Sequence, residues 1–174
     1  KCCVTLIFRP AIVAAALLFT AALPSHHVQA ESLAGSYLAA SQANFENNYA
    51  ASALYYTRAL AADPDNLGLM QNVVLAYLSK GDAEKAVPIA AKMESLGANS
   101  QLAQLLLLTE AIRKENFADA AALFEKGASF SPLLDGLIRG WVDFGKGDMS
   151  AATAEFDEMR ANNAMRVFSD YHRA

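Results

Sequence analysis

Apolar residues recur at the three- and four-residue spacing of an amphipathic helix along most of the chain after residue 31. Short polar segments interrupt this pattern, and they contain the residues that commonly end one helix and begin the next. The pattern predicts helices over 33–46, 49–62, 67–80, 83–96, 101–114, 117–130, 133–145 and 149–161, and a ninth from about residue 165. The chain is therefore predicted to be all-α.

The polar turns between these helices repeat at a nearly constant interval. Asn47-Asn48-Tyr49 is followed 34 residues later by Gly81-Asp82-Ala83, then after 34 more by Glu115-Asn116-Phe117, and after 32 more by Gly147-Asp148-Met149. Each turn has apolar helical segments on both sides. Four copies in register indicate a tandem repeat of helix, tight turn and second helix.

This repeat resembles the tetratricopeptide repeat (TPR). The residues that carry the resemblance are small ones where paired helices touch, aromatic ones in the second helix and prolines at the junctions: Ala59, Ala86, Ala120, Ala152; Tyr56, Phe124, Phe156; Pro64, Pro132. The resemblance covers about residues 33 to 166. It implies a right-handed α-solenoid of about four helix hairpins plus the start of a fifth, in which neighbouring hairpins bury each other's apolar faces.

Two residues depart from the repeat. Gly127 stands where the third copy would usually have alanine, and Pro88 falls inside the second helix of the second copy. Proline in a helix interior costs about 3 kcal/mol, so we expect Pro88 to kink that helix or to delay its start. Two interpretations are open for Pro88: a local packing defect, or a bend in a binding surface.

The resemblance also implies which residues face a binding groove, because the first helix of each TPR hairpin lines the concave side. The positions implied are Tyr37, Asn72, Leu75, Leu105, Leu106, Ile112, Leu137, Trp141 and Phe144. TPR proteins that grip a peptide's terminal carboxylate use Lys, Asn and Arg at five such positions. Only Asn72 matches here, since the others are Tyr37, Ser41, Leu102 and Leu106, so a clamp of that kind is disfavoured.

The implied groove becomes more apolar toward its C-terminal end, where Trp141 and Phe144 lie. An amphipathic helix of a partner protein is the usual occupant of an apolar groove, and aromatic residues are the usual anchors. The alternatives are that these residues belong to the core, or that further repeats of the same chain cover them. Residues 167–174 resemble the opening of a fifth hairpin without its second helix, which suggests a fragment of a longer protein.

The first thirty residues differ in composition from the rest of the chain. Lys1 and Arg9 make the start basic, residues 11–23 carry no charge, and Val28-Gln29-Ala30 offers the small residues that a signal peptidase recognises. Thirteen helical residues span about 20 Å, short of the roughly 30 Å hydrocarbon core. We therefore expect a signal peptide over 1–30, cleavage near Ala30 and export, to the periplasm in particular. The alternative is an uncleaved anchor that includes residues 4–8.

Composition and charge exclude several classes of binding site. A formal charge of −4 excludes a polybasic nucleic-acid binder, and His172 is the sole histidine after residue 30. The remaining residues show no metal-ligand spacing, and Gly145-Lys146-Gly147-Asp148 occupies a repeat turn, so it is not read as a phosphate loop.

These observations, with the resemblance to exported bacterial TPR proteins, predict a non-catalytic protein-binding scaffold of the cell envelope. We expect no cofactor, metal, nucleic acid or small-molecule substrate, and membrane contact through the signal segment alone. The alternatives are the N-terminal part of a longer or self-associating array, or an accessory domain of an enzyme lying downstream.

Overall fold

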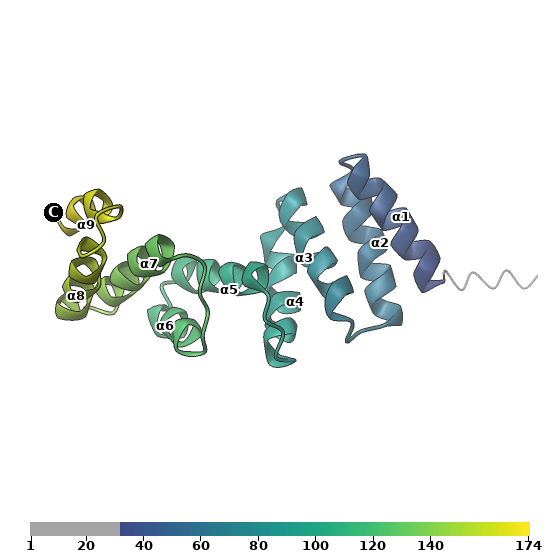
Figure 1. Ribbon diagram of the computed structural model, residues 1–174. Coiled ribbons are helices and arrows are strands. Elements are labelled where there is room, and N and C mark those ends of the chain that lie inside the picture. The colour runs from purple at the N-terminus through teal and green to yellow at the C-terminus, as the bar shows by residue number, and fades with distance from the viewer. Residues whose placement is uncertain (1–31) are drawn as a thin grey trace, which may run out of the picture. The chain divides into compact units, whose positions relative to one another are not determined.

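The computed structural model describes residues 32–174, so the predicted signal peptide and its cleavage near Ala30 lie outside the described residues. Within the described range the chain contains nine α-helices and no strand, which confirms the all-α prediction. The helices are α1 (Leu33–Phe45), α2 (Tyr49–Ala62), α3 (Leu67–Lys80), α4 (Ala83–Ser95), α5 (Gln101–Arg113), α6 (Phe117–Glu125), α7 (Pro132–Gly145), α8 (Met149–Arg160) and α9 (Arg166–Arg173) (Figure 1).

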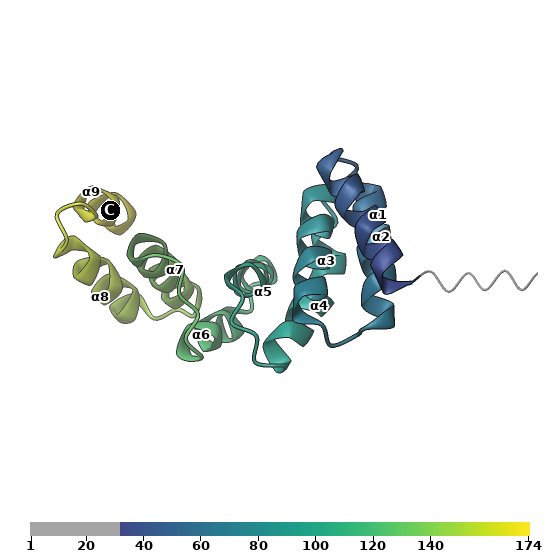
Figure 2. The same ribbon diagram turned by 45° about the vertical axis from the view of Figure 1, so that its right-hand side comes forward.

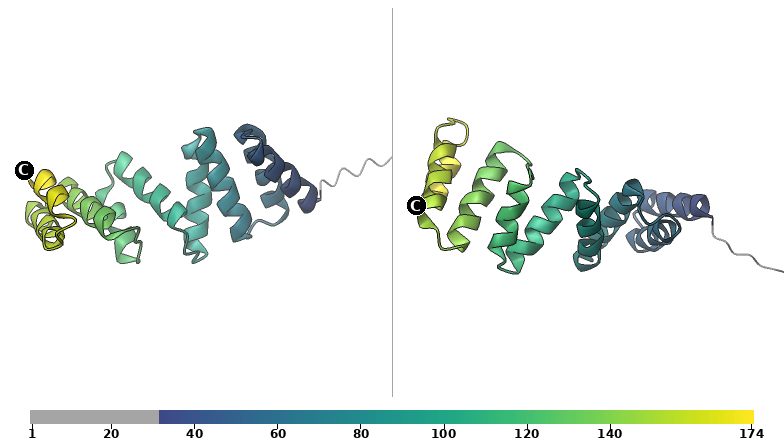
Figure 3. Two further views of the ribbon diagram at one scale, coloured as in Figure 1. Left: turned by 45° about the horizontal axis from the view of Figure 1, so that its top comes forward. Right: turned by 90° about the horizontal axis from the view of Figure 1, so that it is seen from below.

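Helices that follow one another in the sequence pack against one another. Each helix from α2 to α8 contacts the helix before it and the helix after it, and α3 and α5 also touch directly. Three further views show the same succession of helices in chain order (Figures 2 and 3). Local packing of this kind lets each helix bury its apolar side on its sequence neighbours.

The turns that repeat in the sequence also repeat in backbone geometry. Their first residues, Asn47, Gly81, Glu115 and Gly147, all have positive φ, between 58° and 87°. The next residue in each turn donates its N–H to a carbonyl five residues back, for example Asn48 to Ala43 at 2.8 Å and Asn116 to Ala111 at 2.8 Å. This hydrogen bond and a left-handed residue define a helix C-cap of the Schellman type. The same C-cap geometry therefore ends α1, α3, α5 and α7.

The small and aromatic residues that define the repeat are buried. Ala59, Ala86 and Ala120 are fully inaccessible to solvent, and Ala152 nearly so. The aromatic residues of the second helices are also buried: Tyr56, Phe124 and Phe156. Alanine lets two helices approach closely, and the ring fills the space beside it. The burial of these residues agrees with the packing roles that the repeat predicts.

The core lies in two clusters that meet at α5. The first cluster includes Met70, Val73 and Val74 of α3, which are completely buried, and it extends from α1 to α5. The second extends from α5 to α7, and Leu107 packs against both clusters. The apolar core is therefore continuous through α5.

One helix ends earlier than predicted, and another contains a proline. The helix expected over 117–130 ends at Glu125, because Gly127 adopts a φ of 96° and the N–H of Ala128 bonds to the carbonyl of Leu123. The helix predicted over 83–96 is confirmed as α4, which begins at Ala83 and continues through Pro88, so of the two effects expected of this proline the delayed start does not occur. Proline removes a single N–H there, and the carbonyl that it leaves free belongs to Glu84, a solvent-exposed residue.

Candidate protein-binding surface

The first helix of each hairpin (α1, α3, α5 and α7, hereafter the first helices) starts at a side-chain cap. Ser32 and Asn66 each accept a hydrogen bond at 3.0 Å from the backbone N–H three residues on, and Ser100 and Ser131 do the same at 3.3 Å. Such caps satisfy an N–H group that the helix itself leaves unpaired. They fix where each first helix begins.

Exposed apolar side chains concentrate on the first helices. Ten of the large apolar residues that remain exposed in the described part of the chain lie there: Leu33, Tyr37, Leu38, Phe45, Leu67, Leu75, Leu105, Leu134, Trp141 and Phe144. The second helices of the hairpins (α2, α4, α6 and α8) expose two, Leu54 and Met149. Isolated exposed apolar residues need no explanation, but a concentration on one set of helices indicates a contact surface.

Five of the nine predicted groove residues are exposed in the structure. Tyr37, Leu75, Leu105, Trp141 and Phe144 have exposed fractions between 38% and 50%. We call these five residues the first-helix surface. Every first helix contributes to it, and α7 contributes two aromatic side chains.

The other four predicted groove residues are less accessible. Asn72, Ile112 and Leu137 are half-buried, whereas Leu106 is buried in the first core cluster. Leu105 and Leu106 are consecutive, so their side chains leave the helix about 100° apart and only one can point away from the core. Leu106 therefore serves mainly the core.

The first helices carry few charges. α1 contains no Asp, Glu, Lys, Arg or His, α3 contains Lys80 alone, and the charged residues of α5 begin at Glu110, whereas α7 carries Asp135, Arg139 and Asp143. In contrast, α8 carries four charged residues: Glu155, Asp157, Glu158 and Arg160. Over α1, α3 and the first part of α5 the surface is apolar with few charges, which favours an apolar partner over an acidic or basic one.

An aromatic cluster forms where α7, α8 and α9 meet. The Trp141 ring makes edge contacts with Phe144 at 5.5 Å and Phe156 at 6.3 Å between centroids. Trp141 also donates a hydrogen bond from Nε1 to Nδ1 of His172 at 3.2 Å, and the His172 ring stacks on Phe156. The side chain of His172 on α9 thus contacts Trp141, which stays 46% exposed. The prediction missed His172, because its place depends on how α9 docks.

Two ion pairs and a hydrogen bond hold α9 on α8. Arg160 pairs with Asp170 at 2.9 Å, and Arg173 pairs with Asp157 at 3.0 Å. The hydroxyl of Ser169, which is completely buried, donates to the carbonyl of Phe156. These contacts fix the side of α9 that faces α8 and leave its opposite side open.

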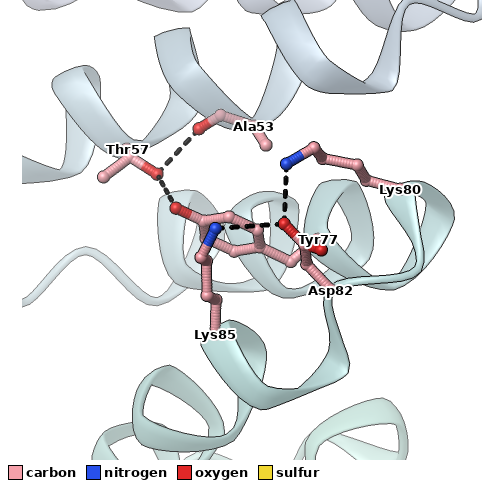
Figure 4. A network of polar contacts seen from close by, with 6 residues as sticks. All are labelled: Ala53, Thr57, Tyr77, Lys80, Asp82 and Lys85. Atoms are coloured by element: carbon pink, nitrogen blue, oxygen red, sulfur yellow. Dashed lines mark hydrogen bonds and ion pairs between the residues drawn. The ribbon is translucent and has the colours of Figure 1, made fainter.

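A polar network joins α2, α3 and α4 (Figure 4). Asp82 accepts hydrogen bonds from Lys80 at 2.6 Å and Lys85 at 3.1 Å, and these two ammonium groups lower the pKa of its carboxyl. Beside this pair the Tyr77 hydroxyl lies 3.3 Å from the Thr57 hydroxyl, which itself donates to a carbonyl of α2. Lys85 also lies over the Tyr77 ring. These contacts tie neighbouring helices together.

Two other carboxyl groups have shifted pKa values with structural causes. Hydrogen bonds from Arg113 and Lys114 lower the pKa of Glu110 to about 2. Burial raises the pKa of Glu155, an effect that Arg139 opposes. A carboxyl with a pKa near 2 is a poor general acid or base at neutral pH, so Glu110 is suited to helix stabilisation and not to proton transfer.

Two further findings complete the description of the site. Among residues 32–174, no group of three or more His, Cys, Asp or Glu side chains is arranged to hold a metal ion. None of the helices in that range has the length and apolar character needed to cross a membrane.

Comparisons with known proteins gave no family assignment: no family model matches the sequence, and none of the curated proteins matches it either. The TPR resemblance is therefore a prediction from the repeat alone.

Proposed function

We propose that the protein is a non-catalytic scaffold that binds an apolar segment of a partner protein on its first-helix surface. The observation that carries this proposal is the unequal distribution of exposed apolar side chains, ten on the first helices against two on the second. An apolar surface of this kind is stabilised when a partner removes it from water.

The architecture proposed with this function is a right-handed α-solenoid of about four TPR hairpins plus the start of a fifth. Packing between consecutive helices and the repeated C-cap geometry support it. Small-angle scattering tests it, because a globular chain of about 144 residues has a radius of gyration near 15 Å. A solenoid gives a clearly larger value, and a value near 15 Å contradicts the solenoid.

The partner segment is proposed to be a helix with one apolar face and few charges on that face. α1 and the first two turns of α5 offer no charged side chain to pair with, so a charged face would lose its hydration without compensation. Apolar residues three and four apart on a partner helix match the size of exposed residues such as Leu75 and Leu105.

The cellular setting proposed is the bacterial envelope, after export and signal cleavage near Ala30. The uncharged run over 11–23, the basic start and the small residues before Glu31 support it. Cell fractionation with N-terminal sequencing of the exported protein tests this part: we expect a mature chain that starts near Glu31, and an intact cytoplasmic chain would contradict it.

A paired substitution tests the binding surface. Leu75→Glu combined with Leu105→Glu places charges on α3 and α5, and we expect partners to be lost when the protein is used to capture binding proteins from a periplasmic extract. Leu54→Glu is the matched control, because Leu54 is 50% exposed and Leu75 46% exposed, but Leu54 lies on a second helix. Retention of the same partners by the double variant, with its helical content intact, would contradict the proposal.

A further inference from the structure

The outer side of α9 is an apolar stripe that no other described helix covers. Val167, Phe168 and Tyr171 have exposed fractions of 76%, 46% and 78%. At 100° per residue these three side chains fall within about 100° of the helix circumference. The buried residue Ser169 lies on the opposite side, toward α8.

The stripe continues into the aromatic cluster of α7. The Tyr171 ring contacts His172 at 5.2 Å, His172 contacts Trp141 at 5.9 Å, and Trp141 contacts Phe144 at 5.5 Å between centroids. Trp141 and Phe144 are themselves about half exposed. We call these five apolar residues (Trp141, Phe144, Val167, Phe168 and Tyr171) the end patch.

The exposed area of the end patch is enough for an interface between two copies of the chain. Side chains of this size bury roughly 150–250 Å² each when fully covered, so their exposed fractions amount to about 500 Å². Two such patches together bury about 1,000 Å², which is the lower bound for a specific protein–protein interface.

Two of the three charged residues on α9 are already paired within the chain. Asp170 and Arg173 on α9 form their ion pairs with Arg160 and Asp157 of α8, and Arg166 donates to the side-chain oxygen of Asn163. An acidic or basic partner therefore finds little to attract it there. A second copy can approach without strong repulsion, since its charges are satisfied in the same way.

From these observations we infer that the end patch pairs with the end patch of a second copy across a two-fold axis. The two α9 helices then run antiparallel, so each stripe packs on the other, and the start of one helix lies near the end of its partner. The end patch shares Trp141 and Phe144 with the first-helix surface, but Leu75 and Leu105 take no part in the pairing, so substitutions at these two leucines test partner binding separately.

Sedimentation of the purified protein over a range of concentrations tests this pairing. We expect a reversible monomer–dimer equilibrium with a dissociation constant in the micromolar range, because the interface is near the minimum size. Val167→Asp and Tyr171→Asp should each raise the dissociation constant at least tenfold. Phe45→Asp is the control, since Phe45 is 82% exposed at the end of α1 and lies outside the end patch.

Cross-linking keeps the test decisive if an aspartate variant loses structure. With Cys2 and Cys3 replaced by serine, Tyr171→Cys should form a disulfide-linked dimer on mild oxidation, whereas Phe45→Cys should not. A protein that stays monomeric at every concentration overturns the inference, because the end patch then does not mediate self-association. A dimer that links through residue 45 and not through residue 171 also overturns it. Normal dimerisation of the Leu75→Glu, Leu105→Glu variant separates this pairing from partner binding.

Discussion

Gly140 marks the closest approach of α7 to α8, and its replacement by alanine gives the sharpest test of how these helices pack. A Cβ atom at Gly140 would lie 2.5 Å from Cε1 and 2.6 Å from Cζ of Phe156. The Phe156 ring is buried and packs against both Trp141 and His172, so it has little room to move. The neighbouring Gly136 is the comparison, because its added Cβ would meet Cγ and Sδ of Met159 at 2.6 and 2.7 Å, and an unbranched side chain can adjust more readily than a ring.

The expected magnitude follows from two opposing effects. Replacing glycine by alanine inside a helix stabilises the folded state by about 1 kcal/mol. Forcing an extra methyl group into a packed core costs about 1–3 kcal/mol, and we expect the upper end of this range at Gly140, where the ring is held. Gly140→Ala should therefore lower the free energy of unfolding by about 2 kcal/mol, while Gly136→Ala should change it by less than about 1 kcal/mol.

Thermal and urea unfolding, followed by far-ultraviolet circular dichroism, measure this difference. A loss of about 2 kcal/mol corresponds to a fall in Tm of about 4–8 °C for a chain of this size. Trp141 fluorescence should change as well in Gly140→Ala, because the displaced Phe156 ring contacts both Trp141 and His172. A Gly140→Ala variant that unfolds at or above the parent's Tm would refute the close packing of α7 on α8.

Three further substitutions test individual features. Glu115→Gly should stabilise the fold by about 1 kcal/mol, measured by urea unfolding, because Glu115 has a φ of 58° that a side chain disfavours; a loss of stability would contradict this. Ser52→Ala should raise Tm by a few degrees, since the buried Ser52 hydroxyl has no hydrogen-bond partner; a lower Tm would show an unrecognised bond. The pKa of Glu110 falls from 4.5 to about 2 on folding, so its stabilisation is present above about pH 4.5 and is lost as the pH falls toward 2. Glu110→Gln should therefore lose less stability than the parent across that pH range, and parallel curves would refute the ion-pair explanation.

Helix positions could be predicted well because the turns carry a strong local signal. The residue pairs that begin with Asn47, Gly81, Glu115 and Gly147 mark a helix end and the next helix start in each copy, and the structure places a left-handed residue at all four. The end of α6 was harder, because Gly127 can occupy a helix or a left-handed C-cap. Which of these two conformations Gly127 adopts depends on whether residues 128–130 can pack against neighbouring helices as part of a longer helix.

The candidate surface could be predicted only in part, because exposure depends on neighbouring helices. The repeat pattern identified Leu75 and Leu105 as surface residues, but it also included Leu106, which the core buries. It gave no indication that His172 would bond to Trp141, since that contact joins α7 to α9 over 31 residues. Local pattern fixes the helices, whereas contacts between distant residues decide which faces remain open.

Site-specific photo-cross-linking in living cells tests the central claim, binding on the first helices, most directly. A photoreactive amino acid at position 75 is compared with the same group at position 54, since both leucines are similarly exposed but lie on different sets of helices. The account predicts a discrete cross-linked protein from position 75 and none from position 54. Equal cross-linking from both positions, or cross-linking from position 54 alone, would contradict it.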